Sequence, residues 1–293
     1  MTTPRVVVVH RTSEYDALLG RHGTRGQAAF FLQGRGRDLA EVELRHAALA
    51  AGLQRVSAAI PMDWRRSSVE RAELAGYLFT PDDLVVVVGQ DGLVANVAKY
   101  LHGQPVIGIN PDRATIAGVL TRHEPAAAAD LLHDAARARA SVEERAMVRL
   151  TADDGQELIA LNEVYVGHAS HQTARYRLGW DDVEERQASS GLLVGTGTGA
   201  TGWCLSAWSE RERLIELPGP LSRELAWFVR EAWPSPTSGT TLTQGLLDDD
   251  ELRIDVESDR LVAFGDGIEA DRLELTWGQR VTVARAERVL RLV

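Results

Sequence analysis

A glycine-flanked aspartate is the residue best suited to chemistry in this sequence. Gly89-Gln90-Asp91-Gly92 directly follows the apolar run Leu84–Val88 and precedes a segment with helical character. Ligands of open α/β sheets bind beyond the carboxyl ends of strands, where glycines allow close backbone approach and a helix N-terminus favours an anion. A carboxylate does not itself bind phosphate, so Asp91 suits a general base or a metal-linked carboxylate. The alternative is a plain strand-to-helix turn in which Asp91 caps the helix.

A run of alternating glycine and threonine forms a second candidate site. The segment Gly195-Thr196-Gly197-Thr198-Gly199-Ala200-Thr201-Gly202 offers backbone N–H groups and hydroxyls, as a phosphate-binding loop does. It precedes Trp203–Trp208, an expected helix whose N-terminus would add to an anion site. The lysine of a Walker A motif is absent, so the segment is not a P-loop. A glycine-rich β-turn is the alternative.

The polar pair Asn162-Glu163 is the third candidate. It interrupts an apolar stretch, with Leu158–Leu161 before it and Val164–Val166 after it. Polar side chains in a buried strand need partners or a ligand. The alternative is an edge strand in which both side chains face water.

The sequence offers no residues for a protein-held metal site. His168 and His171 are three residues apart, but no third ligand lies nearby in the sequence. Cys204 is the single cysteine, which excludes an internal disulfide and a cysteine-built metal site. We therefore predict no protein-held metal site from the residues alone.

The first 120 residues are predicted to form a parallel sheet that positions the aspartate turn. Strand and helix signals alternate there, as expected of a sheet with helices on both faces. The expected strands are Val6–Val9, Leu84–Val88 and Val106–Ile109, and the expected helices are Asp38–Leu53, Ser67–Leu78 and Val94–Leu101.

The rest of the chain is predicted to be mainly β after an alanine-rich helix within 121–140. Met147–Thr151 and Glu157–Val166 form an expected hairpin, and six further short strands follow it. We predict an α/β domain over residues 1–120 and a β-rich domain over 121–293, with the final strand free to return to the first domain.

Composition limits the class of protein. The chain has 293 residues, of which 44% are hydrophobic and 25% charged, with a formal net charge of −10. An acidic chain is a poor candidate for nucleic-acid binding. No apolar run reaches the length of about 20 residues that spans a membrane. The N-terminus leads directly into an expected strand, so we expect no signal peptide and predict a soluble cytoplasmic protein without nucleic-acid or membrane partners.

Together these motifs resemble the NAD kinase family, part of a wider group with 6-phosphofructokinases and diacylglycerol kinases. The family pattern is GGDG(T) after a strand, then an NE pair, then a loop rich in glycine and threonine. The sequence is most similar to the mitochondrial-type NAD kinases. The segments that carry this likeness are Pro105–Asn110, Ala160–Val164, Ser189–Leu192 leading to Gly195–Gly199, and the late Gly265-Asp266-Gly267.

The resemblance implies a fold and an activity. The fold is a Rossmann-like α/β N-terminal domain with a β-rich C-terminal domain of the NAD kinase/diacylglycerol kinase type, which binds the dinucleotide and assembles a homodimer. The activity is transfer of a phosphoryl group from ATP, with a divalent metal such as Mg²⁺, to the 2′-hydroxyl of the adenosine ribose of NAD, giving NADP. The site is expected between the two domains.

The resemblance also implies residue roles. Asp91 would take the hydroxyl proton. The residues implied at the nucleotide phosphates are Gly89, Gln90, Gly92, Thr196, Gly197, Thr198 and Gly199. The residues implied at the dinucleotide are Asn162, Glu163, Ser190, Thr201, Trp203 and Ser206.

Three positions depart from the pattern of most family members. Gln90 replaces the second glycine, Leu93 replaces a threonine, and Ser190 replaces an aspartate, although the mitochondrial-type branch also has serine there. A kinase for a sugar or lipid hydroxyl and a non-catalytic nucleotide-binding relative are the alternatives. The sequence leaves open NAD or NADH as acceptor and ATP or polyphosphate as donor.

Overall fold

The chain divides into two compact units, which are described separately. The computed structural model describes residues 3–293. The first unit runs to Glu143 and also includes Arg291–Val293, and the second runs from Glu144 to Leu290. The sequence placed the boundary at residue 120. The structure moves it to 143 because the helix after residue 120 packs on the first sheet, where Ala128 and Leu132 share a core with Val86 and Ile107.

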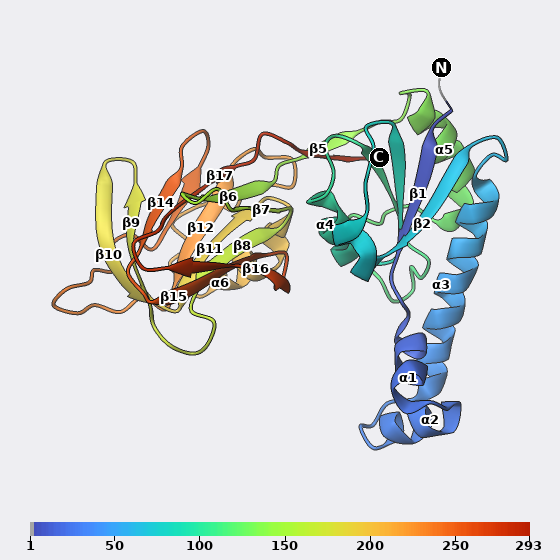
Figure 1. The fold of residues 1–293 in the computed structure, drawn as a ribbon, viewed down its shortest axis with the longest axis horizontal. Coiled ribbons are helices and arrows are strands. Elements are labelled where there is room, and N and C mark those ends of the chain that lie inside the picture. The colour runs from blue at the N-terminus through green and yellow to red at the C-terminus, as the bar shows by residue number, and fades with distance from the viewer. Residues whose placement is uncertain (1–2) are drawn as a thin grey trace. The chain divides into compact units, whose positions relative to one another are not determined.

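The first unit is built on a sheet of six strands in the order β2-β1-β3-β4-β18-β5 (Figure 1). From β2 to β18 each neighbouring pair is parallel. The central strand β3 is buried along its whole length, as its run of valines predicts for a strand covered on both faces. The strands are β1 (Arg5–His10), β2 (Arg65–Glu70), β3 (Asp83–Val88), β4 (Pro105–Ile109), β5 (Glu143–Arg145) and β18 (Leu290–Leu292).

Helices cover this sheet and also extend beyond it. The short helices α1 and α2 pack on one end of α3 through a small core of their own, away from the sheet (Figure 1). The helical segments are α1 (Glu14–His22), α2 (Arg25–Gln33), α3 (Leu39–Ala59), η1 (Arg71–Gly76), α4 (Asp91–Ala98), η2 (Pro125–Ala127) and α5 (Ala128–Ala136). No helix among the described residues is long and apolar enough to cross a membrane.

Two expected helices of the first unit differ from the structure. The helix predicted over Ser67–Leu78 is wrong, because Ser67 lies in the parallel strand β2 and only a short 3₁₀ segment follows. Glu70 and Glu73 form a capping box at the start of this 3₁₀ segment. The helix expected over Asp38–Leu53 continues to Ala59, and Gly52 lies inside it against Pro111, where a larger side chain would collide.

The second unit is a sandwich of two antiparallel six-stranded sheets. Their strand orders are β10-β9-β14-β17-β6-β7 and β13-β12-β11-β8-β15-β16. The first sheet contains β6 (Val148–Ala152), β7 (Glu157–Ala160), β9 (Ala174–Trp180), β10 (Val183–Ser189), β14 (Leu252–Val256) and β17 (Arg280–Arg285). The second contains β8 (Glu163–Gly167), β11 (Gly191–Thr196), β12 (Leu225–Arg230), β13 (Gln244–Leu247), β15 (Arg260–Gly265) and β16 (Ile268–Thr276).

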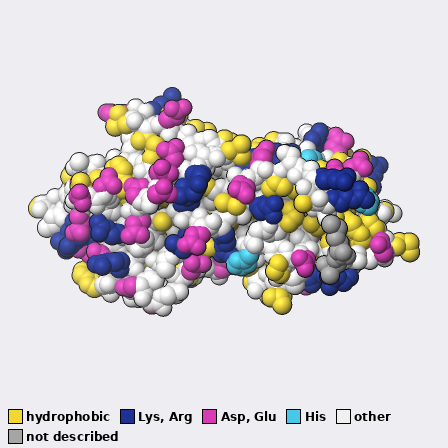
Figure 2. All heavy atoms as spheres, turned by 90° about the horizontal axis from the view of Figure 1, so that it is seen from above, with side chains coloured by type: hydrophobic (Ala, Val, Ile, Leu, Met, Phe, Trp, Pro, Cys, Tyr) yellow, Lys and Arg dark blue, Asp and Glu magenta, His cyan; other side chains and the backbone are white. Residues whose placement is uncertain are grey.

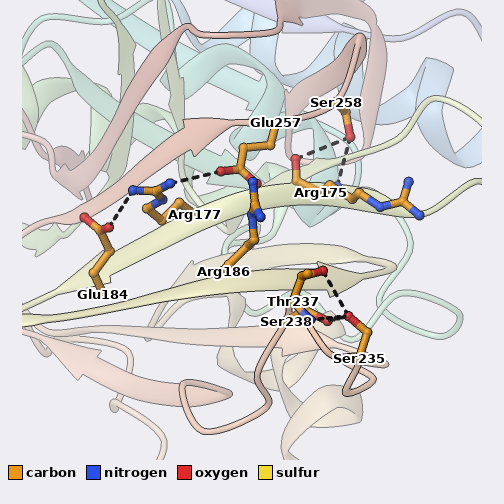
Figure 3. A network of polar contacts seen from close by, with 9 residues as sticks. All are labelled: Arg175, Arg177, Glu184, Arg186, Ser235, Thr237, Ser238, Glu257 and Ser258. Atoms are coloured by element: carbon orange, nitrogen blue, oxygen red, sulfur yellow. Dashed lines mark hydrogen bonds and ion pairs between the residues drawn. The ribbon is translucent and has the colours of Figure 1, made fainter.

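The two faces of the sandwich sheets differ in character. The inner faces form one apolar core that contains the fully buried Tyr176 and Trp227. The outer face of β9 and β10 is charged, and Glu257 there pairs with both Arg177 and Arg186 (Figure 3). Exposed pairs of this kind contribute about 0–1 kcal/mol each, so the apolar core holds the sandwich together. Acidic and basic side chains are also interspersed over the face of the molecule in Figure 2.

A short helix covers the other face of the second sheet. The helix α6 (Trp203–Ser209) follows the 3₁₀ turn η3 (Gly199–Thr201) and packs on β11 and β12. Cys204 and Ala207 of α6 share a small core with Leu193 and Phe228. This packing holds the C-terminal end of the glycine- and threonine-rich segment against the second sheet.

Candidate functional site

The aspartate turn lies at the carboxyl end of β3, as expected. Gly89 has a φ of 154° and donates its N–H to Ile109 O of the neighbouring strand, 3.0 Å away. Gln90 is exposed and is the N-cap residue of α4, although its side chain makes no capping bond. Gly92 is exposed, and a Cβ added there would meet nothing within 4 Å. Packing does not require glycine at position 92, so the space above it is free for a ligand.

The carboxylate of Asp91 accepts four hydrogen bonds from one short segment. Its Oδ1 accepts from Leu120 N at 2.9 Å, from Thr121 N at 2.8 Å and from the Thr121 hydroxyl at 3.0 Å. Its Oδ2 accepts from Val119 N at 2.8 Å. Asp91 is therefore the first residue of α4 and the anchor of the segment 119–121, a structural task that the sequence did not reveal.

The anchored segment closes a compact loop after β4. Asn110 accepts a bond from Asp112 N at 2.9 Å and donates one to Ile116 O at 3.0 Å. Gly118 has a φ of 70°, and a Cβ there would lie 2.6 Å from Asn110 Nδ2. The loop returns beside β4 where His123 N donates to Gly108 O at 3.1 Å. Both ends of the loop are thus tied to the strand.

Leu93 points into the first unit. Its side chain is 5% exposed, within a helix whose residues from Leu93 to Ala98 are all buried. The side chain at this position is therefore part of the core, and in this conformation it does not present a group to a nucleotide.

In the second unit the polar pair lies at the junction of two strands, with Asn162 in the bend and Glu163 as the first residue of β8. The interpretation of Asn162-Glu163 as an interruption of one buried strand is wrong, because β7 ends at Ala160 and β8 begins at Glu163. Leu161 and Asn162 form the bend between them. A bend brings polar side chains to the end of a sheet without burying them in its interior.

Asp266 holds that bend in place. Its carboxylate accepts hydrogen bonds from the backbone N–H groups of Leu161, at 3.0 Å, and Asn162, at 2.6 Å. The backbone N–H of Asp266 donates a hydrogen bond to Glu163 O at 3.0 Å. Asp266 has a φ of 52°, which is uncommon for a residue other than glycine. The late glycine-aspartate-glycine segment therefore positions the polar pair.

The glycine- and threonine-rich segment packs directly on the same bend. The Thr196 hydroxyl donates to Leu161 O at 2.6 Å and accepts from Thr198 N and Gly199 N. A Cβ at Gly199 would collide with Asn162 O, and one at Gly197 with Gly219 O. Close packing thus requires these glycines, and several of the N–H groups that we expected at a phosphate have partners within the unit.

Neither side chain of the polar pair has a hydrogen-bond partner among the residues that the structure describes. Burial, together with the nearby charge of Asp266, raises the pKa of the Glu163 carboxyl to about 7. Burial and the charge of Glu163 raise the pKa of the Cys204 thiol to about 12. Glu163 is thus a half-buried carboxyl that can either donate or accept a hydrogen bond near neutral pH.

The other expected dinucleotide contacts surround α6. Thr201 and Ser206 are exposed, and Trp203 is half-buried and stacks on Tyr165 with ring centroids 5.3 Å apart. The Tyr165 hydroxyl donates to the backbone oxygen of Ser190 at 2.6 Å. A cavity of about 430 Å³ borders this group, and its lining includes Trp203, Ser206, Arg211, Arg230 and Gln244.

The structure thus brings the predicted residues together in two groups. Gly89, Gln90, Asp91 and Gly92 form one turn in the first unit. The pair Asn162-Glu163 and the 195–199 segment form one cluster in the second. Thr121 was not among the predicted residues, because no pattern in the sequence marks it. Asp266 was among the quoted motif residues, but the anchoring role of its carboxylate was not predicted.

Curated NAD kinases match parts of this chain. The NAD kinase of Methylococcus capsulatus is 37% identical over 134 residues, which cover 43% of this chain and 45% of that protein. The NAD kinase of Acinetobacter baylyi is 37% identical over 133 residues, 42% of each chain. The matched part of the chain is therefore similar to NAD kinases. A longer match, to the NAD kinase of Caldicellulosiruptor saccharolyticus, has 28% identity over 201 residues and covers 66% of this chain and 70% of that relative.

Solved structures agree on the fold. The crystal structure of yeast NADH kinase complexed with NADH matches 99% of this chain and 83% of its own, with a TM-score of 0.61 and 14% sequence identity. This confirms the predicted fold, an N-terminal domain with a parallel sheet and a β-rich C-terminal domain. No family model matches the chain. The first two matches span less than half the length of those relatives, and the mitochondrial-type branch stays a prediction.

The resemblance to NAD kinases implies a magnesium ion. Across residues 3–293, no three side chains of histidine, cysteine, aspartate or glutamate gather in a way that could hold a metal ion. Mg²⁺ at nucleotide sites is usually held by one or two carboxylates together with phosphates. Oδ2 of Asp91, with a single hydrogen bond, has room for one further ligand contact. The residues therefore fit a magnesium ion that arrives with the nucleotide, not one held in a protein cage.

Proposed function

We propose that this chain transfers a phosphoryl group from ATP to the 2′-hydroxyl of the adenosine ribose of NAD, giving NADP. The observation that carries the proposal is its similarity to curated NAD kinases, at 37% identity over 134 residues for one of them. Phosphoryl transfer depends mainly on positioning and on neutralising charge, so one placed carboxylate, backbone donors and a magnesium ion suffice.

In the first unit, Asp91 is proposed to accept the proton of the attacking hydroxyl. Gly89, Gln90 and Gly92 are proposed to lie against the nucleotide phosphates. The open space at Gly92 and the eight-residue helix α4 behind the turn support this, because a helix N-terminus favours an anion. The magnesium ion, when bound, would neutralise phosphate charge.

In the second unit, Asn162 and Glu163 are proposed to bind the adenosine part of the acceptor. The support is that both side chains lack hydrogen-bond partners among the described residues while Asp266 holds their backbone. The further contacts proposed for the dinucleotide are Ser190, Thr201, Trp203 and Ser206, and those proposed for phosphates are Thr196, Gly197, Thr198 and Gly199. The buried Thr198 hydroxyl has no hydrogen-bond partner within residues 3–293, which supports a polar ligand beside it.

The assembly and location remain part of the proposal. We propose a homodimer in the cytoplasm, as the family resemblance implies. Light scattering on the purified chain tests the first of these, and fractionation of the cells that express it tests the second.

A nucleotide-binding relative without turnover is the second candidate function. One observation favours it: the Asp91 carboxylate already accepts four hydrogen bonds, so its visible task is structural. Under this alternative ATP and NAD would bind, but no phosphoryl transfer would follow.

A coupled assay for NADP formation separates the two candidates. Purified chain is incubated with Mg²⁺, with ATP or polyphosphate as donor, and with NAD as acceptor. For NADH, a sugar or a diacylglycerol as acceptor, the readout is consumption of the donor, because none of these gives NADP. We expect NADP from ATP and NAD, with the Asp91→Asn variant as the inactive control. Binding of both nucleotides without product would support the alternative and overturn the proposed activity.

A further inference from the structure

The four hydrogen bonds to Asp91 are divided unequally between its two oxygens. Oδ1 accepts three of them, from Leu120 N, Thr121 N and the Thr121 hydroxyl, whereas Oδ2 accepts only Val119 N. A carboxylate has about four acceptor positions, two on each oxygen. The three donors on Oδ1 already exceed its two positions, so Oδ1 is filled, and one acceptor position remains on Oδ2.

The two oxygens also differ in their surroundings. Thr121, which supplies two of the donors to Oδ1, is 0% exposed, and Leu120 is 3% exposed. Val119, the partner of Oδ2, is 60% exposed. The filled oxygen thus faces the buried part of the loop, and the oxygen with the remaining position lies beside the exposed residue.

The loop that carries these donors is held in one place. A Cβ at Gly108 of β4 would collide with Leu120 O and lie 2.8 Å from Thr121 Cα, so the loop presses directly on the strand. Asn110 N donates to His123 O at 2.7 Å, which ties the end of the loop to the end of β4. Donors fixed in this way hold a side chain in one orientation without reorganisation.

We propose that Thr121 is the positioning residue of Asp91: it supplies two of the three donors that fill Oδ1 and so leaves Oδ2 as the oxygen that meets the acceptor hydroxyl or the magnesium ion. This inference rests on the proposed function, because it concerns the carboxylate proposed as the base. Thr121 acts through Asp91 and makes no contact with substrate itself.

The test compares two substitutions at Thr121. Thr121→Val keeps the shape and removes the hydroxyl, whereas Thr121→Ser keeps the hydroxyl and removes a methyl group. The measurements are kcat, the KM values for NAD and ATP, and the thermal unfolding midpoint, with activity assayed well below the lowest midpoint. Thr115→Val in the same loop is the matched control, since Thr115 is exposed and bonds only Asp112.

We expect Thr121→Val to lower kcat at least tenfold while both KM values stay within twofold. Thr121→Ser and Thr115→Val should keep kcat within threefold of the wild type. Thr121→Ala replaces the valine variant if that protein does not fold. Equal kcat losses for valine (or alanine) and serine, or a valine variant with unchanged kcat, would overturn the positioning role.

The wild-type arm separates this inference from the proposed function. If the wild type forms NADP and Thr121→Val does so equally well, only the role of Thr121 is wrong. If the wild type binds nucleotide without forming NADP, the proposed function is overturned, and the positioning role is overturned with it.

Discussion

The two units use the same structural device but leave different groups for a ligand. In the first unit, Asp91 belongs to the motif itself, and its carboxylate accepts the backbone N–H groups of Val119, Leu120 and Thr121. In the second unit, the anchoring carboxylate is that of Asp266, and the motif residues Asn162 and Glu163 keep their side chains without hydrogen-bond partners among the described residues.

This difference teaches that the type of a motif residue does not reveal how much of it is available for chemistry. Where a second residue takes the structural task, as Asp266 does, the motif side chains are available to a ligand. Where the motif residue itself anchors the backbone, as Asp91 does, only the acceptor position not used by the anchoring hydrogen bonds is available to a ligand. Each of the following substitutions changes a side chain in one of the two units compared.

The largest effect is expected from Asp91→Asn. An oriented base contributes on the order of 10²–10⁴-fold, so we expect NADP formation to fall at least a hundredfold. The amide nitrogen of the new asparagine is a hydrogen-bond donor, and it would face one of the N–H or O–H donors of the loop. Hydrogen exchange of the amides of residues 119–121 should therefore become faster. The measurements are the coupled NADP assay and amide exchange. A variant that keeps more than about a tenth of the wild-type rate, well short of the loss expected for a base, would leave Asp91 as an anchor only.

Asp266→Ala removes the anchor of the second unit. The N–H groups of Leu161 and Asn162 lose their acceptor, and each buried donor without a partner costs about 1–3 kcal/mol, so we expect a loss of about 4 kcal/mol in unfolding free energy. The KM for NAD should rise more than the KM for ATP. Denaturant unfolding and steady-state kinetics measure both effects, and the exposed Asp259→Ala is the control. Unchanged stability would show that the bend does not depend on Asp266.

Glu163→Gln tests the unpaired carboxyl of the second unit through pH. The pKa of Glu163 is raised from 4.5 to about 7 in the folded protein, so the folded state binds more protons than the unfolded state between these values. Wild-type stability from this group should therefore fall as the pH rises from about 4.5 to 7, by at most about 3 kcal/mol. The glutamine variant lacks this dependence, so its melting temperature should exceed that of the wild type at pH 8 and approach it at pH 5. Parallel pH profiles for the two proteins would contradict the assignment.

The smallest effect is expected from restoring the family residues in the aspartate turn. Leu93→Thr replaces a buried apolar side chain by a polar one and should lower the unfolding free energy by about 2 kcal/mol. Gln90→Gly changes an exposed cap residue and should cost less than about 1 kcal/mol. Denaturant unfolding of each variant measures this. A faster NADP formation in Leu93→Thr would show instead that position 93 reaches the nucleotide.

The sequence predicted the elements whose signals are local. The valine run of β3 and the apolar segment of β4 predicted buried parallel strands, and the aspartate turn was predicted at the carboxyl end of β3. The sequence did not predict that Asn162-Glu163 packs against the 195–199 segment, and the ligands of both remain predictions.

Features that depend on tertiary contacts could not be predicted. Ser67 lies in a strand because β1 offers a parallel partner, which overrides the local helical signal. Gly52 does not end α3, because its lack of a side chain serves contact with Pro111. The bonds between Asp91 and Thr121 join residues thirty positions apart, and no pattern in the sequence marks Thr121 as the partner.

The most direct test of the account is a calorimetric titration of NAD into the wild type, Asn162→Ala and Asp91→Asn. The side chain of Asn162 is available in the second unit, whereas the carboxylate of Asp91 is mostly bonded within the first. We therefore predict that Asn162→Ala weakens NAD binding about tenfold, equivalent to about 1.4 kcal/mol, while Asp91→Asn leaves the Kd within threefold of the wild type. Wild-type affinity in Asn162→Ala, together with a large loss in Asp91→Asn, would contradict the account.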